Sequence, residues 1–190
     1  MRSKPVLAVV GLVAVVLAAA FLAGCGGGSE KGGSGGKITV TDLAGRKVEL
    51  KALAEKVVAI GPGALRLVCY TDDADKVVGI ENIEKQMPVG RPYMKVNEEL
   101  LSLPVIGQGG PDSTPDPEML MNVNPDVIFA AYLVDSSKAD ELQSRTGIPV
   151  VVLSYGKLGT FDQELLDSIK LVGQVTGSEK RAEEVVGYIE

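Results

Sequence analysis

Arg91 and Tyr93 lie two positions apart in a long polar connection that contains proline, and their chemistry suits the binding of an anionic or aromatic ligand. A guanidinium fork matches carboxylate, catecholate and other oxyanion groups, whereas a tyrosine ring can stack on a ligand or hydrogen-bond to it. Connections of this length usually carry function. The alternative is that both side chains belong to an ordinary solvated loop.

Glycines and tyrosines beside expected strand ends are further candidates. Pro62 and Gly63 lie in a turn that opens a helix, where backbone N–H groups suit an anionic oxygen, unless the two residues only form the turn. Gly110 follows another glycine, so the backbone there can approach a ligand closely. Tyr132 and Tyr155 each end a strand, and ligands of open α/β sheets bind beyond the carboxyl ends of the strands. We expect both tyrosines to line a cleft; otherwise they cap the core with their hydroxyls in water.

The chain has no histidine among its 190 residues. Hydrolytic triads therefore lose their usual general base, and transition-metal sites lose their commonest ligand. The sequence also contains neither a Gly-x-Gly-x-x-Gly fingerprint nor a Walker loop. We expect a binding protein without a cofactor or a directly bound metal, rather than an enzyme. Cys69, in an apolar helical stretch, is expected to be an inert, half-buried thiol.

Acidic residues outnumber basic ones by 25 to 19, and the formal net charge is −6. Loss of residues 1–24 would remove Arg2 and Lys4 and no acidic residue, which makes the charge about −8. A chain this acidic is not expected to bind nucleic acid. The remaining length suffices for one compact core, so a single globular unit is expected.

Residues 1–24 combine a short basic start with a long uncharged apolar stretch, which is typical of an export signal. A membrane-spanning anchor is the alternative, because the stretch is near the roughly 18-residue minimum for crossing a bilayer. The ending Leu22-Ala23-Gly24-Cys25 resembles the lipobox of bacterial and archaeal lipoproteins. That resemblance implies cleavage before Cys25, lipid attachment to it, and a lipid-anchored protein on the extracytoplasmic face of the cell membrane. Residues 25–36 are rich in glycine and serine and predict a flexible tether.

Strands and helices alternate in the pattern of residues 37–177, which predicts an α/β lobe with a parallel sheet and helices on both faces, preceded by a β-hairpin over residues 38–50. A further helix, for which Ser178 is the expected N-cap, is still running at Glu190, so we expect the sequence to be the first part of a longer protein. Asp116 and Pro117 are the expected N-cap and first residue of a helix that Asn124 ends. The other expected strands are 57–60, 77–80, 105–107, 126–131 and 148–153, and the other expected helices are 64–71, 136–145 and 161–175.

The order of these elements, with Asp42-Leu43-Ala44-Gly45-Arg46 at the hairpin turn, Asn124-Pro125-Asp126-Val127-Ile128 and Gly147-Ile148-Pro149-Val150-Val151, resembles the amino-terminal lobe of the iron-siderophore and vitamin B12 class of substrate-binding proteins of ABC importers. The resemblance covers residues 37–190. It implies a two-lobed receptor that holds its ligand in the cleft between the lobes. Residues 178–190 would begin the long helix that joins the lobes, and the second lobe would lie outside this sequence.

The same resemblance assigns roles to single residues. Glu118 stands where the family docks its lobe onto arginines of the membrane permease, although a first-turn carboxylate also suits the helix dipole. Tyr93 and Tyr132 become stronger candidates for the cleft, and Gly110 stands where an aromatic residue is sometimes found.

The function expected from these features is a lipid-anchored solute-binding component of an ABC importer for a chelated metal, foremost an iron(III)-siderophore complex. The lack of histidine favours capture of a whole complex, or of an oxyanion such as molybdate, over a bare divalent ion. Cobamides and haem are alternative ligands. Two alternatives from other classes are a surface interaction or sensor lobe without a small ligand, and a membrane-tethered enzyme.

Overall fold

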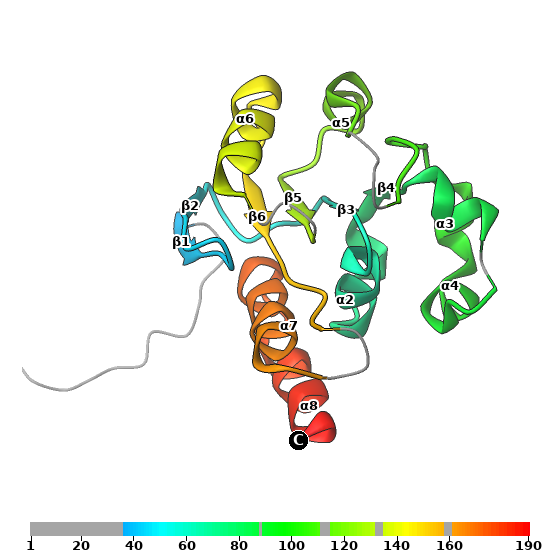
Figure 1. The fold of residues 1–190 in the computed structure, drawn as a ribbon, viewed down its shortest axis with the longest axis vertical. Helices are drawn as coiled ribbons and strands as arrows, with labels where there is room; N and C mark the ends of the chain where they lie inside the picture. The colour runs from blue at the N-terminus through cyan, green and yellow to red at the C-terminus, as the bar shows by residue number, and fades with distance from the viewer. Residues whose placement is uncertain (1–35, 88, 111–114, 132–134, 158–160) are drawn as a thin grey trace, which may run out of the picture. The chain divides into compact units, whose positions relative to one another are not determined.

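A four-stranded parallel sheet in the order β4-β3-β5-β6 lies at the centre of the computed structural model (Figure 1). The structure describes residues 36–87, 89–110, 115–131, 135–157 and 161–190. The strands of the sheet are β3 (Val57–Ile60), β4 (Val77–Gly79), β5 (Val127–Ala130) and β6 (Val150–Val152). Every residue of β3, β5 and β6 is buried, as expected for parallel strands covered on both faces.

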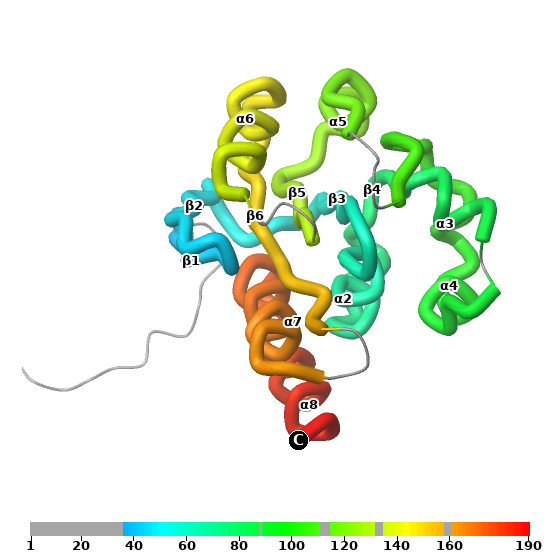
Figure 2. The backbone as a smooth tube through the Cα atoms, in the orientation of Figure 1, coloured from blue at the N-terminus to red at the C-terminus, as the bar shows by residue number. Residues whose placement is uncertain are grey.

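Alternate residues of each strand face two different cores, because successive side chains of a strand point to opposite faces. Val57 and Phe129 belong to the core shared with α2 (Ala64–Tyr70) and α7 (Gln163–Thr176). Ile60 and Ile128 belong to the core shared with α5 (Pro117–Val123) and α6 (Ser136–Thr146). Figure 2 shows α5 and α6 on one side of the strands and α2 and α7 on the other. The predicted parallel sheet with helices on both faces is confirmed.

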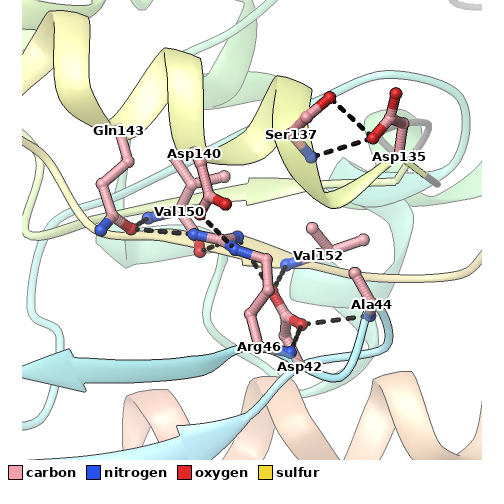
Figure 3. Close-up of polar contacts among 9 residues, drawn as sticks. All are labelled: Asp42, Ala44, Arg46, Asp135, Ser137, Asp140, Gln143, Val150 and Val152. Carbon is pink, nitrogen blue, oxygen red and sulfur yellow. Dashed lines mark hydrogen bonds and ion pairs between the residues drawn. The ribbon is translucent and has the colours of Figure 1, made fainter.

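The predicted hairpin is also confirmed, with β1 (Ile38–Thr41) antiparallel to β2 (Lys47–Leu50). The Asp42 carboxylate closes its turn by accepting from the Ala44 and Arg46 N–H groups, at 3.1 and 2.8 Å. Asp42 also accepts from the Val152 N–H at 3.2 Å, and Leu43 N–H donates to the Val152 carbonyl at 3.1 Å. The turn is thereby fastened to β6, the last strand of the sheet (Figure 3).

Arg46 extends this attachment to α6 (Figure 3). Its guanidinium lies 3.0 Å from the buried Asp42 carboxylate and 2.8 Å from Asp140 of α6, and donates to the Val150 carbonyl at 3.1 Å. The Gln143 side-chain oxygen accepts from the Val150 N–H at 3.0 Å. Side chains rather than another strand therefore satisfy the outer backbone groups of β6.

The long connection after β4 is more regular than expected. It contains the helices α3 (Asn82–Gln86) and α4 (Pro92–Val96) and the 3₁₀ turn η2 (Glu98–Ser102), after the earlier 3₁₀ turn η1 (Ala74–Lys76). Each of these elements is too short for an apolar period to appear in the sequence. Conversely, the strand expected at 105–107 is reduced to a single bridge between Ile80 and Val105.

Helix boundaries follow the predicted caps, with one exception. Asp116 accepts from the N–H groups of Glu118 and Met119 at 3.0 and 3.2 Å, and Pro117 is the first residue of α5. Asn124 ends α5 in the left-handed conformation, with φ of 48°. Ser178 precedes α8 (Glu179–Ile189) as expected, but its hydroxyl donates to Asp73 at 2.7 Å instead of capping the helix. The Ser178 prediction was therefore right in position and wrong in mechanism.

The final helix α8 packs against α7 along its first two turns. Ala182 and Val186 are buried there, and Gly173 of α7 lies so close that an added Cβ would stand 2.8 Å from the Ala182 Cβ. Tyr188, near the end of α8, is 92% exposed. The role of residues 178–190 as the start of an interlobe helix stays a prediction.

Candidate functional site

Two of the predicted site residues meet beyond the carboxyl ends of β3 and β6. Gly63 follows β3 with φ of 78°, a conformation that favours glycine. The Tyr155 Cβ lies 3.2 Å from the point where a Cβ of Gly63 would stand, and Tyr155 is 42% exposed. Pro62 lies half-buried in the same loop. The structure thus brings Pro62, Gly63 and Tyr155 together.

Arg66, in the first turns of α2, reaches the same place. One of its terminal nitrogens lies 3.5 Å, and its Cζ 3.9 Å, from the Cβ position of Gly63. The Cζ stands 5.8 Å from the centre of the Tyr70 ring, within range of a cation–π contact. The Arg66 Nε is buried and has no hydrogen-bond partner among the residues that the structure describes. A guanidinium with unused donors therefore lies beside Gly63 and Tyr155.

Glu81 lies under the loop that follows β3. Its carboxylate accepts from the Gly61 N–H at 3.0 Å, and Glu81 is 6% exposed. Burial raises the pKa of Glu81 to about 7, against the lowering effect of the Gly61 hydrogen bond. An added Cβ on Gly109 would stand 2.7 Å from the Glu81 Cβ, so the 107–110 loop packs on this residue. The N–H of Gly61, at the start of the predicted anion-binding turn, is thus occupied by a carboxylate of the protein itself.

Arg91 and Tyr93 are held together by Glu84 of α3. The Arg91 Nε lies 3.0 Å from the Glu84 carboxylate, and the Tyr93 hydroxyl donates to the same oxygen at 2.9 Å. Arg91 also donates to the Met87 carbonyl. Burial raises the pKa of Glu84 and of Tyr93. Both predicted ligand-binding side chains are therefore engaged by an internal carboxylate, and no hydrogen bond or ion pair within the described residues joins them to Gly63 or Tyr155.

The remaining candidates are dispersed. Gly110 has φ of 97°, and its Cβ position lies 3.6 Å from Ile83 of α3. Glu118 is exposed in the first turn of α5. Tyr132 and Cys25 lie outside the described residues. Cys69 is half-buried, and burial raises the pKa of its thiol to about 12, in agreement with the inert role expected of it.

The described ranges show neither a metal-binding cluster nor a helix suited to span a membrane. No cluster of three or more histidine, cysteine or acidic side chains in them is arranged to hold a metal ion. None of the helices in the same ranges has the length and apolar character needed to cross a membrane.

Arg66, Glu81 and Glu84 were not among the predicted site residues. Arg66 is the one charged residue in a short apolar stretch, and its neighbours Ala64, Leu65, Leu67 and Val68 are all buried. A single cation in such a stretch could have marked Arg66 as a candidate binding residue. Glu81 directly follows a buried strand, the position from which a side chain reaches the carboxyl edge of a sheet. No comparable signal identified Glu84 as the partner of Arg91.

An α/β lobe with a partly exposed tyrosine and a half-buried arginine at the strand ends has the architecture of a ligand-binding domain. Residues 57–190 match the family model described as periplasmic binding protein. The chain belongs to this family, and the predicted resemblance is confirmed.

Individual relatives agree with this assignment. The uncharacterized ABC transporter substrate-binding lipoprotein YvrC of Bacillus subtilis (strain 168) is 26% identical over 180 residues, which cover 91% of this chain and 52% of YvrC. The chain thus spans about half the length of this curated relative.

Solved structures share the fold over a similar extent. The molybdate periplasmic binding protein MolA of Haemophilus influenzae, bound to molybdate, matches with a TM-score of 0.64 and 23% identity, covering 78% of this chain and 49% of MolA. Staphylococcus aureus SirA complexed with staphyloferrin B matches with a TM-score of 0.60 and 24% identity, covering 80% of this chain and 46% of SirA. At these identities the two structures support the fold alone.

Proposed function

We propose that this chain is the amino-terminal lobe of the solute-binding component of an ABC importer, and that it contributes half of a ligand cleft rather than a catalytic site. The observation that carries the proposal is the meeting of Gly63 and the exposed Tyr155 beyond the carboxyl ends of β3 and β6. In α/β sheets this edge is where ligands bind. Membership of the periplasmic binding protein family supports the same reading.

The ligand we propose is a chelated metal, foremost an iron(III)-siderophore complex. A chain without histidine is better suited to a whole complex than to a bare transition-metal ion. SirA, which has the same fold, was solved with staphyloferrin B, and this supports the siderophore class. Molybdate is the principal alternative, because MolA was solved with molybdate bound. Cobamides and haem remain the other ligands to test.

The experiment is a ligand titration of the full-length protein, including any residues encoded beyond Glu190. Ferric siderophores, cobalamin, haem and molybdate are added separately and followed by calorimetry and by tyrosine fluorescence, since the chain has no tryptophan. We expect one saturable site, weakened at least about tenfold by Tyr155→Ala and unchanged by Tyr188→Ala, because hydrogen bonds and ring contacts of a central aromatic residue contribute on the order of 1–3 kcal/mol. Absence of saturable binding for every ligand would refute the receptor function.

We also propose that Cys25 carries the lipid anchor and that the lobe lies on the extracytoplasmic face of the cell membrane. The lipobox sequence supports this, as does the lipoprotein relative YvrC. Cys25→Ser is expected to move the protein from the membrane fraction to the soluble fraction. Retention of the variant in the membrane would contradict lipid attachment at this residue.

The proposed partner is the permease of the importer, contacted through Glu118. Glu118 is exposed at the start of α5, beside the exposed Met119 and Met121. A carboxylate with apolar neighbours suits a surface that carries arginines, because charge complementarity steers association and apolar contacts add affinity.

A further inference from the structure

We propose that Arg66 binds an anionic group of the ligand, a carboxylate or a metal oxyanion, at the loops that follow β3 and β6. This inference rests on the proposed receptor function and specifies the chemistry that the site recognises. It assigns the role to a residue of α2 rather than to Arg91, whose guanidinium is already bound to Glu84.

Arg66 has no ion-pair partner among the described residues. Each of the other arginines in the described ranges forms an ion pair with a carboxylate: Arg46 with Asp42, Arg91 with Glu84, Arg145 with Glu141 and Arg181 with Asp72. Arg66 forms none there, although acidic residues outnumber basic ones by 25 to 19 in the chain. Its Nε is buried and lacks an acceptor within the same ranges, so an anion from outside the protein would meet the terminal nitrogens of the guanidinium rather than Nε. Because no carboxylate of these ranges pairs with the positive charge, an anionic group of the ligand is the partner that would neutralise it.

The Arg66 guanidinium is held between the Tyr70 ring and Gly63. The Tyr70 ring lies 5.8 Å from its Cζ and stabilises the positive charge without consuming an N–H donor. Gly63 borders the guanidinium on another side, since a terminal nitrogen of Arg66 lies 3.5 Å, an ordinary contact distance, from the point that a Cβ at position 63 would occupy. The Arg66 head group is thereby placed beside the strand ends.

Arg66 and Tyr155 approach the same glycine, Gly63. The Tyr155 Cβ lies 3.2 Å from the same point of Gly63, so a cation and a partly exposed tyrosine converge on one glycine. Glu81, the nearby acidic residue at the end of β4, directs its carboxylate to the Gly61 N–H instead. A planar fork with several donors binds carboxylates and tetrahedral oxyanions bidentately, which an ammonium group does not. The carboxylates of a ferric chelate and a free oxyanion such as molybdate share this chemistry.

The test is calorimetric titration of the full-length protein with three probes. Ferric citrate presents carboxylates, sodium molybdate is a free oxyanion, and ferrioxamine B presents hydroxamates without a carboxylate on its iron. The variants are Arg66→Gln and Arg66→Lys, and the matched control is Arg145→Gln on the outer face of α6. Thermal unfolding of each variant without ligand is measured in parallel.

We expect ferric citrate or molybdate to bind, and the identity of the bound probe distinguishes the two sources of the anion. Arg66→Gln should weaken that binding by roughly 10- to 100-fold, the range for a hydrogen bond to a charged group. Arg66→Lys should restore only part of the affinity, because lysine keeps the charge and loses the fork. Arg145→Gln should leave affinity unchanged, and Arg66→Gln should unfold close to the temperature of the unsubstituted protein, since among the described residues it loses only the ring contact with Tyr70.

Three results would overturn the inference, and they are distinguishable from failure of the receptor function. Equal affinity of Arg66→Gln and the unsubstituted protein for the anionic probe would overturn it alone. Binding of ferrioxamine B only would exclude the anionic class while leaving a receptor. A melting temperature of Arg66→Gln well below that of Arg145→Gln would show that the guanidinium has an internal partner besides the Tyr70 ring. No binding of these probes, cobalamin or haem to the unsubstituted protein would refute the receptor function and this inference together.

Discussion

At the scale of single residues, Glu81 combines burial with an ordinary structural task. Its carboxylate accepts from the Gly61 N–H, yet burial raises its pKa to about 7 from the ordinary value of 4.5. Between these two pH values the folded protein retains a proton that the unfolded chain releases. The contribution of Glu81 to stability is therefore greatest near and below pH 4.5, falls as the pH rises towards 7, and levels off above it.

Replacement of Glu81 by glutamine should remove this dependence. The amide oxygen can still accept from Gly61, while the cost of ionising a buried carboxyl disappears. We expect the free energy of unfolding of the unsubstituted protein to fall by about 1–3 kcal/mol more between pH 5 and 8 than that of Glu81→Gln. Urea unfolding across this range measures the difference, with the exposed Glu55→Gln as control. Parallel curves for Glu81→Gln and the unsubstituted protein would contradict the assigned burial effect.

The residue scale is also where prediction from sequence succeeded least. The sequence suggested Arg91 for an anionic group of a ligand, and gave no sign that Glu84, seven positions earlier, would pair with it. Partners of this kind depend on how α3 and α4 turn against each other, which neither motif nor periodicity records. The closeness of Tyr155 and Gly63 could be expected from the sequence, because a parallel sheet brings strand ends to one edge.

At the scale of elements, the crossing of α7 and α8 depends on one glycine. A Cβ at Gly173 would stand 2.8 Å from the Ala182 Cβ and 3.1 Å from the backbone of Ser178 and Glu179. Gly173→Ala should therefore force the two helices apart and lower the free energy of unfolding by about 1–3 kcal/mol. Gly187 of α8 is a matched control, since nothing lies within 4 Å of its Cβ position.

We expect Gly187→Ala to stabilise the protein by about 0.5–1 kcal/mol, the usual gain from alanine in an exposed helix. Chemical unfolding of both variants measures the opposite signs. Similar effects of the two substitutions would mean that the helices do not approach closely at Gly173.

The hairpin offers a second contrast at this scale, because Arg46 is paired with two different aspartates. The Asp42 side chain is 0% exposed and the Asp140 side chain is 65% exposed. Asp42→Ala removes the buried carboxylate that pairs with Arg46 and accepts from the Val152 N–H, and should destabilise the fold by about 3–5 kcal/mol. Asp140→Ala should cost about 0–1 kcal/mol, as for surface ion pairs. Thermal and urea unfolding compare them, and equal losses would argue against the hairpin as a fixed part of the lobe.

Element types were well predicted wherever a period or cap was present. The alternation of β1 and β2, the apolar runs of β3, β5 and β6, and the Asp116-Pro117 start of α5 all matched the structure. The 105–107 strand was overestimated, because an apolar pair bounded by Pro104 and Gly107 has room for only one bridge. The five-residue helices α3 and α4 were missed, since helices so short owe their existence to packing rather than to pattern.

At the scale of the whole molecule, the proposed importer makes binding and delivery separable. Glu118→Ala in the full-length protein should leave ligand affinity unchanged and reduce ligand uptake by cells several-fold, because Glu118 is placed on α5 and away from Gly63 and Tyr155 in the proposed scheme. Glu49→Ala, on the hairpin, is the control for loss of a surface carboxylate. Unchanged uptake with Glu118→Ala would refute docking through this residue, whereas loss of affinity would place it in the ligand site instead.

The fastening of the hairpin also has a consequence for how copies of this protein meet. The outer border of β6 is already occupied by Asp42, Leu43, Arg46 and Gln143. An intruding strand from a neighbouring chain would have to expel a buried aspartate and its arginine before it could pair with Val150 or Val152. This border of the sheet is thus guarded against edge-to-edge polymerisation.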